Sequence, residues 1–592
     1  TRSEPLYQSE HSTRGEAVMT ISAPSSILQK LRRLVLPSRP DPAKSRRIAE
    51  GRLVVSCGVA LAVFMTIGTR VVLLSTTTEA SSAPAIPMAS NVERGQILDR
   101  KGRLLASNLP MTVLHADPTE IMNAADAAEK LAPLIENHDV ASLTKLLSKK
   151  TRYVELDRKL TPGRHAQILQ LGIPGVYFRD GNLRVYPRGN AAAHILGQVD
   201  TQNIGIAGME KSMDAHLMAG EDVTLSIDIG LQAIISREIA RQIDTFEAIG
   251  GAGVLLDIKS GEVLAMVSLP DFNPNHLGKI SDDAKFNRAT KGMYEMGSTF
   301  KVLNTAIALE TGTVSLGQRY DVAKPLRISR FAISDYHMYS RPLNISEILV
   351  YSSNIGSAKM ADQFGAETQR AYMDRLGLLE RLPLELPEIG NPLTPARWKR
   401  VETMTVSYGH GISISPAHLA SAVAAASGDG TLTPPTLLKR MPGDKPMKTR
   451  IFSEDTTRAV RSMMRLVVSH PDGTGNFAEA PGYMVGGKTG TAEKIDNGRY
   501  NRRANLATFV ATFPTHDPRY VLTIMVDEPK GQKHSAGYAT GGWVAAPAVR
   551  RIVEQAAPLL GIHPVDEKSP EIRQKLLFDL QIGEEANALA SY

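Results

Sequence analysis

Residues 92–225 have a hydrophobic pattern that predicts a mixed α/β module. Apolar and polar positions alternate over 91–106 on both sides of Lys101-Gly102, which is typical of two strands joined by a turn. Helical periodicity follows over 124–136 and 141–149, and 222–227 (DVTLSI) has the composition of a further strand. We therefore expect this region to fold as one elongated domain of helices and strands.

From about residue 226 the pattern predicts a second, larger domain that ends near 556. An amphipathic helix is predicted over 231–246, followed by two strands, 253–257 and 262–267, around a tight turn. Strands at both ends of a helical middle predict an antiparallel sheet flanked by helices. Residues 557–592 are expected to form a solvated tail with one short helix. The other predicted elements are strands at 507–513 and 520–526 and helices at 300–310, 346–364 and 416–426.

One apolar stretch near the N-terminus predicts a membrane anchor. Residues 53–69 carry no charge, and the stretch continues to 75 past Arg70, which lies near enough to one end to reach the interface. Basic residues precede the stretch, whereas 75–91 contain no Lys or Arg, so the N-terminus is expected in the cytoplasm. We expect 1–52 to be a basic cytoplasmic tail, 53–75 an uncleaved single-pass anchor, and 76–91 a linker.

Charge and cysteine content exclude several classes of function. The net charge is +7, but residues 1–52 hold ten Lys/Arg against five Asp/Glu, so the rest of the chain is nearly neutral. A neutral body argues against nucleic-acid binding. The single cysteine, Cys57, excludes an intrachain disulfide and a cysteine-based metal site, and no HExxH motif occurs. No metal and no other cofactor is therefore expected.

Ser298 and Lys301 are the first candidate catalytic pair. They are three positions apart at the start of a predicted apolar helix, so their side chains lie on one face and can meet. A serine hydroxyl needs a base to become a nucleophile, and a partly desolvated lysine can serve. The spacing alone is weak evidence, because Ser142 and Lys145 share it in a charged stretch that predicts a surface helix.

Two further short motifs strengthen this hypothesis. Ser352-Ser353-Asn354 offers a hydroxyl and a carboxamide at a predicted helix–loop junction. Lys488-Thr489-Gly490-Thr491 lies in a strand-like, glycine-containing stretch that a ligand could approach closely. In this order the three match the serine acyltransferase set SxxK, SxN and KTG.

With these motifs the chain resembles the penicillin-recognising enzymes, and specifically class B penicillin-binding proteins of the cell-division (FtsI) type. The resemblance covers nearly everything from residue 53 to about 555. It implies a single transmembrane helix, an elongated non-catalytic pedestal of the dimerisation type (92–225), and a transpeptidase domain (226–556) with a five-stranded antiparallel sheet between helices. The positions that match the family's pedestal motifs are Arg94, Gly95, Asp99, Arg100, Arg184, Tyr186, Pro187, Gly205, Gly208 and Glu210.

The resemblance also implies a role for each candidate site residue. Ser298 attacks the penultimate D-Ala carbonyl of a peptidoglycan stem peptide, and Lys301 accepts its proton. Ser352 and Lys488 relay protons to the leaving amine, and Asn354 orients the substrate amide. An amine of a neighbouring stem peptide then resolves the acyl-enzyme and forms the cross-link. The remaining substrate-binding positions are Thr489, Gly490 and Thr491.

Location and partners follow from the same resemblance. It implies the bacterial inner membrane, with the bulk of the chain in the periplasm and a role in septal wall synthesis. β-Lactams would acylate Ser298 as substrate mimics. The short stretch between anchor and pedestal leaves no room for a glycosyltransferase domain, so a separate SEDS-type (FtsW-like) glycan polymerase and other divisome membrane proteins are the expected partners.

Several alternatives remain beside this hypothesis. Residues 482–489 also satisfy the phosphate-loop pattern GxxxxGK[ST], although a poor strand precedes them and a poor helix follows. A secreted β-lactamase, an elongation-type transpeptidase and a divisome scaffold with little catalysis are the other possibilities. His410 is interpreted as a structural histidine, and the polar stretch containing Arg503 and Asn505 as a solvated loop.

Overall fold

The computed structural model describes residues 55–70, 93–136, 138–276, 278, 280–328, 331–496, 499–577, 580 and 582. Two compact units are distinguished, Thr1–Ser90 and Asn91–Tyr592. In the first unit residues 55–70 are helical, and no helix among the described residues is long and apolar enough to cross a membrane. The expected tail (1–52), both ends of the expected anchor and the expected linker (76–91) lie outside the described residues.

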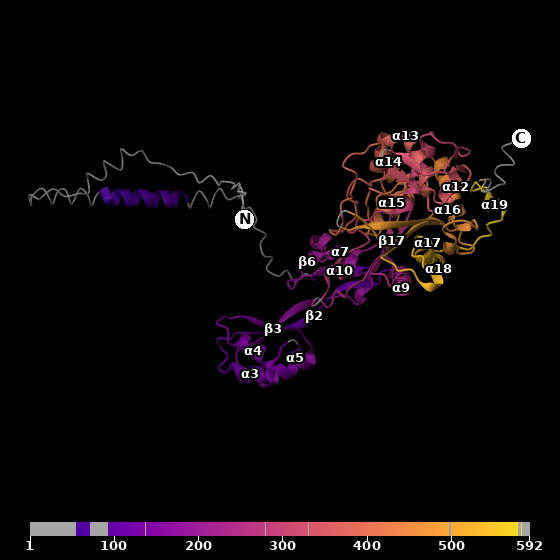
Figure 1. The fold of residues 1–592 in the computed structure, drawn as a ribbon. Coiled ribbons are helices and arrows are strands. Elements are labelled where there is room, and N and C mark those ends of the chain that lie inside the picture. Colours follow the sequence, from indigo (N-terminus) through magenta and orange to yellow (C-terminus); the bar gives the residue numbers. More distant parts are fainter. Residues whose placement is uncertain are drawn as a thin grey trace, which may run out of the picture. The chain divides into compact units, whose positions relative to one another are not determined.

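The predicted pedestal is built on a mixed sheet with the strand order β3-β2-β1-β7, in which β4 also pairs with β2. Three helices, α3 (Ala124–Leu131), α4 (Val140–Leu147) and α5 (Pro162–Leu171), gather beside β3 (Figure 1). Their buried apolar residues, among them Leu131, Leu143 and Ile168, pack on the sheet as a small separate core. The strands are β1 (Ile97–Leu98), β2 (Leu104–Ala116), β3 (Val154–Leu160), β4 (Val176–Val185) and β7 (Val223–Thr224).

The large domain contains the predicted five-stranded antiparallel sheet, in the order β16-β17-β18-β8-β9. Strands from the two ends of the domain meet in its middle, where β18 pairs with β8. The bounds are β8 (Gly250–Asp257), β9 (Val263–Leu269), β16 (Gly486–Asp496), β17 (Arg499–Phe513) and β18 (Tyr520–Asp527).

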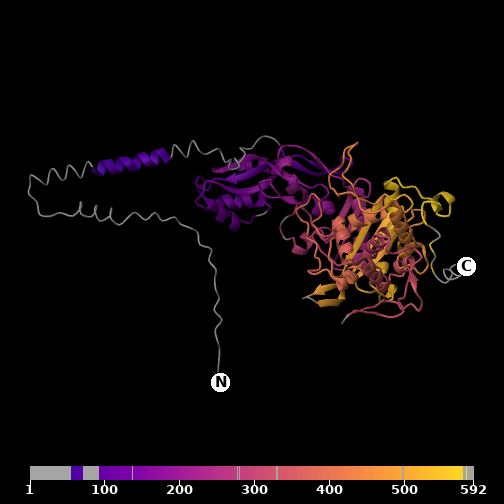
Figure 2. The same cartoon turned by 90° about the horizontal axis from the view of Figure 1, so that it is seen from above.

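Helices cover both faces of this sheet, as the turned view also shows (Figure 2). Alternation along a strand divides its side chains between two cores: Val254 and Leu256 belong to one, and Leu255 belongs to the other. The core of Leu255 lies under α9 (Ile229–Thr245) and α18 (Ala546–Leu559). The opposite core lies under α11 (Phe300–Glu310), α15 (Pro416–Ser427) and α16 (Glu454–Ser469).

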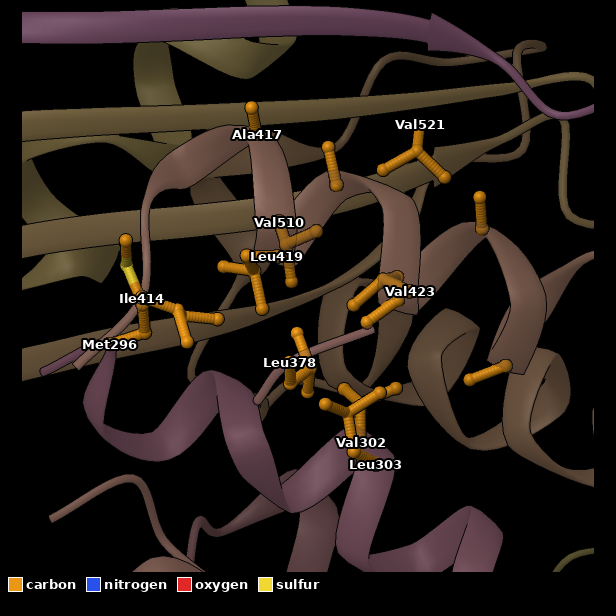
Figure 3. Close-up of a cluster of buried hydrophobic side chains, with 14 of the residues drawn as sticks. Met296, Val302, Leu303, Leu378, Ile414, Ala417, Leu419, Val423, Val510 and Val521 are labelled. Carbon is orange, nitrogen blue, oxygen red and sulfur yellow. The ribbon is translucent and has the colours of Figure 1, made fainter. Parts of the chain in front are cut away.

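The helix α11 is held in the middle of the larger core (Figure 3). Val302 and Leu303 of α11 are fully buried, as are Leu419 of α15 and Val510 of β17. Because α11 begins directly after the 3₁₀ turn Gly297–Thr299, which contains Ser298, this packing fixes the position of the candidate nucleophile.

Three predicted elements differ from the structure. The helix expected over 124–136 ends at Leu131, because Pro133 directs the chain into a 3₁₀ turn. The helix expected over 346–364 is two helices, α12 (Ile345–Val350) and α13 (Asn354–Arg375), with the SxN motif at the break. The polar stretch around Asn505 is not a loop but the first half of β17, since hairpin pairing with β16 outweighs its polar composition.

The tail expected over 557–592 contains the predicted short helix and is largely exposed over 563–577, but the expectation that it is solvated throughout is wrong, because part of it packs on the large domain. Ile572 and Leu576 pack on Met484, and the short helix α19 (Pro570–Arg573) lies in this segment. Glu567 forms an ion pair at 2.7 Å with the nearly buried Arg465. The few apolar residues of this segment therefore extend the large domain.

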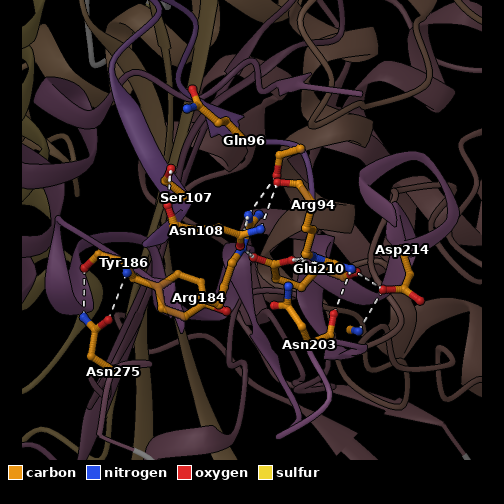
Figure 4. Close-up of polar contacts among 12 residues, drawn as sticks. Arg94, Gln96, Ser107, Asn108, Arg184, Tyr186, Asn203, Glu210, Asp214 and Asn275 are labelled. Carbon is orange, nitrogen blue, oxygen red and sulfur yellow. Dashed lines mark hydrogen bonds and ion pairs between the residues drawn. The ribbon is translucent and has the colours of Figure 1, made fainter. Parts of the chain in front are cut away.

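Glu210 is the centre of the pedestal motif residues (Figure 4). Its fully buried carboxylate accepts from Nε of Arg94 at 2.8 Å and from Nε of Arg184 at 2.7 Å. Arg184 also donates to the Gly95 carbonyl oxygen at 2.8 Å. Two buried guanidinium groups around one buried carboxylate hold three separate segments of the chain together.

Three further motif residues, Gly208, Tyr186 and Arg100, join the pedestal to the large domain. The Gly208 amide donates to the Glu388 carboxylate at 3.2 Å, and the Tyr186 amide donates to the Asn275 side chain at 2.9 Å. Arg100 donates to the Ser226 carbonyl at 3.3 Å.

Asp99 and Arg103 extend this junction to the start of α9. The Asp99 carboxylate accepts from Nε of Arg103 at 2.7 Å, and Arg103 also contacts Asp228, the N-cap of α9. Gly205 donates its amide to Asp214 at 2.8 Å, whereas Pro187 is exposed at the end of β4.

Candidate active site

Ser298 and Lys301 are in hydrogen-bond contact, as the sequence predicts. A 3₁₀ turn (Gly297–Thr299) leads into α11 and places Nζ of Lys301 2.9 Å from Oγ of Ser298. Ser298 is partly exposed, whereas Lys301 is fully buried. Burial, and secondarily the charge of Lys488, holds the pKa of Lys301 well below its ordinary value of 10.5. A lysine with a lowered pKa can be neutral and accept the proton of a neighbouring hydroxyl.

The SxN motif lies on the other side of the lysine. Nζ of Lys301 donates to the Ser352 carbonyl at 2.6 Å, to Oγ of Ser352 at 3.1 Å and to Oδ1 of Asn354 at 2.7 Å. Ser352 has a left-handed backbone (φ 62°), which costs free energy in a residue other than glycine. This conformation turns both its carbonyl and its hydroxyl toward the lysine.

Asp335 is a functional-site residue that the sequence analysis missed. Its carboxylate accepts from the Ser353 hydroxyl at 2.5 Å and from the backbone amides of Asn354 at 2.5 Å and Ile355 at 2.9 Å. The neighbouring Ser334 carbonyl accepts from Nδ2 of Asn354 at 3.0 Å. An acidic residue that caps a helix from a loop elsewhere in the chain has no local sequence pattern, so only the folded structure reveals it.

Lys488 lies on β16, at the edge of the sheet, and is fully buried. Burial lowers its pKa from 10.5 to about 7. Its ammonium donates to the Thr489 carbonyl at 3.2 Å and to the Thr489 hydroxyl at 3.1 Å. Among the described residues no hydrogen bond joins it to Ser298 or Ser352, so its influence on the pair is through its charge. The Thr489 hydroxyl donates in turn to the Thr474 hydroxyl at 3.1 Å. Thr474 is another residue that the sequence analysis missed.

Gly490 and Thr491 lie against the turn that holds Ser298. A Cβ atom at Gly490 would be 2.5 Å from the Met296 carbonyl oxygen, so only glycine allows this approach. A Cβ atom at Gly297 would likewise be 2.7 Å from the Thr491 carbonyl oxygen. The exposed Thr491 accepts at its hydroxyl from the Gly541 amide at 3.1 Å.

The three motifs thus enclose one serine with a buried lysine base, an arrangement suited to acyl transfer. The phosphate-loop alternative does not fit the structure. Residues 482–489 run into strand β16, whereas a phosphate loop must enter a helix whose N-terminus holds the phosphates.

Comparison with known families assigns both parts of the chain. Residues 251–554 match the penicillin binding protein transpeptidase domain, and residues 89–227 match the penicillin-binding protein dimerisation domain. The probable peptidoglycan D,D-transpeptidase FtsI of Caulobacter vibrioides is 39% identical over 481 residues, covering 79% of this chain and 82% of that protein. The peptidoglycan D,D-transpeptidase FtsI of Escherichia coli is 31% identical over 512 residues, covering 80% and 85%.

Solved structures show the same fold. Penicillin binding protein 3 of Mycobacterium tuberculosis, complexed with aztreonam, superimposes with a TM-score of 0.65 at 24% identity and covers 80% of this chain and 98% of that one. A peptidoglycan synthetase from Bifidobacterium adolescentis gives a TM-score of 0.64 at 22% identity, covering 81% and 98%. The fold, the motif geometry and the sequence relatives agree, and the chain therefore belongs to the penicillin-binding protein family, among the FtsI-type peptidoglycan D,D-transpeptidases.

Proposed function

We propose that Ser298 is the nucleophile with which this peptidoglycan D,D-transpeptidase forms its acyl-enzyme. The observation that supports this most directly is the 2.9 Å contact between its hydroxyl and Lys301, whose pKa burial lowers. A neutral lysine takes the hydroxyl proton as the oxygen attacks the penultimate D-Ala carbonyl of a stem peptide. The C–N bond to the terminal D-Ala then breaks.

The other motif residues complete this step. Ser352, which contacts Lys301 at 3.1 Å, passes the proton to the leaving amine, and the charge of Lys488 assists. Asn354 orients the substrate amide. The hydroxyls of Thr489 and Thr491, with Lys488, hold the substrate carboxylate. The backbone N–H groups of Ser298 and Thr491 face the developing oxyanion, which such donors stabilise by several kcal/mol.

β-Lactams are proposed to acylate Ser298 in place of the stem peptide. The solved structures that share this fold include complexes of the Mycobacterium tuberculosis protein with aztreonam and with ampicillin. Attack on a strained lactam amide also gives an ester to the Ser298 oxygen, but the leaving amine stays tethered to the acyl group, so the acyl-enzyme persists.

The site of action is proposed to be the septum at the bacterial inner membrane. The uncharged stretch 53–69, with basic residues before it, supports a single-pass anchor with the catalytic domain in the periplasm. The two family matches support a division into a pedestal over 92–225 and a transpeptidase domain over 226–556. A SEDS-type polymerase would supply the glycan strands.

The first test is covalent labelling of the detergent-solubilised full chain with a fluorescent penicillin. Labelling is expected for the wild type and for Ser142→Ala, and its loss is expected for Ser298→Ala. Ser142 is the matched control, because it has the same spacing to a lysine but lies in the first turn of the pedestal helix α4, where its amide donates to the N-cap Asp139. Labelling that survives in Ser298→Ala would overturn the assignment of the nucleophile.

A further inference from the structure

His410 lies beside the nucleophile, in a segment with no part in the three motifs. The preceding residue, Gly409, packs on the nucleophile turn so closely that a Cβ atom there would be 2.2 Å from the Gly297 carbonyl oxygen. Burial, and secondarily the charge of Lys301, lowers the pKa of His410 below its ordinary value of 6.5. The imidazole is thus neutral at pH 7 and within electrostatic reach of the Ser298–Lys301 pair.

The His410 ring is held by aromatic contacts and not by hydrogen bonds. It stacks on Tyr500 with ring centroids 5.7 Å apart and meets the edge of Tyr408 at 5.2 Å. No described residue forms a hydrogen bond with its ring nitrogens, and the ring is partly exposed. The buried His418 provides the contrast, because its two nitrogens bond to the Ser415 hydroxyl and the Glu380 carbonyl. His410 is therefore oriented with its basic atoms available, which a structural histidine does not need.

Glu295 places a carboxylate against two neighbours of this imidazole, the backbone of Gly411 and the side chain of Tyr500. Its Oε1 accepts from the Gly411 amide at 2.8 Å and from the Tyr500 hydroxyl at 3.2 Å. Its Oε2 is buried and has no hydrogen-bond partner among the described residues, and Glu295 as a whole is only 6% exposed. Among the described residues no cation pairs with this carboxylate, and burial raises its pKa above the ordinary value of 4.5. An ammonium group that enters the site would therefore be attracted to the carboxylate and would stabilise its charged form.

A transpeptidase needs a site for a cationic amine in its second half-reaction. The attacking amine reaches the enzyme as an ammonium ion and must lose two protons before an amide is formed. One proton returns to the Ser298 oxygen, and Lys301 can carry it. The second needs another acceptor. Lys488, the other buried amine of the motifs, forms hydrogen bonds only with Thr489 among the described residues and with neither Ser298 nor Ser352.

We propose that Glu295, Tyr500 and His410 form the subsite for the acceptor, a primary alkylammonium group of a second stem peptide. This inference rests on the proposed function of Ser298. The Glu295 charge draws in the ammonium, and the His410 imidazole removes its first proton. The amine nitrogen then bonds to the ester carbon, the bond from that carbon to the Ser298 oxygen breaks, and Lys301 transfers the second proton to that oxygen. His410 finally releases its proton to solvent.

The test measures how one acyl-enzyme divides between two acceptors. The full chain is given a D-alanyl thioester donor with D-alanine as the amine, and the ratio of aminolysis to hydrolysis product is followed against amine concentration and pH. Because both products come from the same acyl-enzyme, a change in acylation or in the folded fraction leaves the ratio unaltered. His216→Gln is the matched control, since that histidine is an exposed pedestal residue.

His410→Gln is expected to lower the ratio at least tenfold. In the wild type the ratio falls on the acid side as the imidazole becomes protonated. The groups that face this ring are Lys301, Tyr408, Tyr500 and, through Tyr500, Glu295. The acid limb is expected to disappear in His410→Gln, and added imidazole is expected to restore part of the ratio in His410→Ala.

Glu295→Gln keeps the two hydrogen bonds of Oε1 but removes the charge, so the amine concentration that gives half the maximal ratio is expected to rise severalfold. An unchanged ratio and pH profile in His410→Gln would overturn the proposed subsite while leaving the nucleophile assignment intact. Absence of both products in the wild type would overturn the proposed function itself, and the subsite with it.

Discussion

The Asp335 carboxylate and the Ser353 hydroxyl are 2.5 Å apart, and this contact ties a surface loop to the SxN motif. The same carboxylate accepts the first two amides of α13, so it occupies the position where a helix dipole favours a negative charge. Since Ser352 has a strained left-handed backbone, the residues that follow it must be held firmly. Asp335 is therefore a positioning residue for Ser352 and Asn354.

Removal of this cap should weaken acylation more than stability. We expect Asp335→Ala to lower the free energy of unfolding by about 1–2 kcal/mol, as loss of other helix caps does, and to slow penicillin acylation at least tenfold. Asp335→Asn keeps an oxygen acceptor, so its acylation rate should lie between those of the wild type and Asp335→Ala. Asp139→Ala is the matched control, because Asp139 caps α4 in the pedestal. Equal acylation rates in both alanine variants would contradict the positioning role.

A shift in the pH–rate profile provides an independent readout of the same residue. The charge of Asp335 raises the pKa of Lys301, opposing the burial that lowers it. Asp335→Asn should therefore lower this pKa further, so the lysine stays neutral to lower pH and the acid limb of the acylation rate moves down in pH. Movement in the opposite direction would show that the Asp335 charge does not act on the lysine.

Burial of Lys488 should lower the free energy of unfolding at neutral and acid pH. Its folded-state pKa of about 7 lies below its unfolded value of 10.5, so the unfolded chain binds the extra proton between these values. Stability contributed by this group therefore rises with pH from about 7 to 10.5 and is lowest below 7. We expect Lys488→Met to raise the free energy of unfolding near pH 6, measured by denaturant titration, while it abolishes acylation. A stabilisation equal at pH 6 and pH 10 would contradict the lowered pKa.

Gly490→Ala tests how closely β16 must approach the nucleophile. The added methyl group would meet the Met296 carbonyl oxygen at 2.5 Å and the Thr299 side chain at 2.9 Å. The strand must therefore move away from the turn, and we expect the acylation rate to fall at least a hundredfold. Gly317→Ala, where no atom lies within 4 Å of the new carbon, should acylate at the wild-type rate.

Glu210 should be the residue on which pedestal stability depends most. Replacement by Gln removes the negative charge that two buried guanidinium groups share. Loss of one partner of a buried ion pair costs about 3–5 kcal/mol. We expect Glu210→Gln to lower the unfolding temperature of the full chain markedly. Asp126→Ala breaks an exposed pair with Lys130 and should cost less than about 1 kcal/mol. Similar losses in the two variants would contradict a buried ionic centre.

The parts of this structure that could be predicted from sequence are those with a local signal. The apolar helix after Ser298 begins and ends where its pattern indicates, and the sheet strands are near their predicted positions because their residues alternate or are continuously apolar. Asp335, Thr474 and Glu295 were missed, since each acts through a contact with a residue far along the chain. His410 was interpreted as structural, because a sequence does not show whether an imidazole nitrogen finds a partner.

The central pairing of β8 with β18 has a consequence for how this protein is made. Tyr520 pairs with Asp257, so the sheet cannot close until more than 260 further residues after β8 have been synthesised, the spacing from 257 to 520. Until then the β8–β9 hairpin presents an unpaired edge, which is prone to associate with other chains. A ribosome that stalls before residue 520 would release a catalytic half whose two hairpins, β8–β9 and β16–β17, lack the strand that joins them into one sheet. Each molecule therefore becomes able to react with substrate only after β18 has been synthesised, because Lys488 on β16 is held by a sheet that this strand completes, and a growing chain is protected from early acylation.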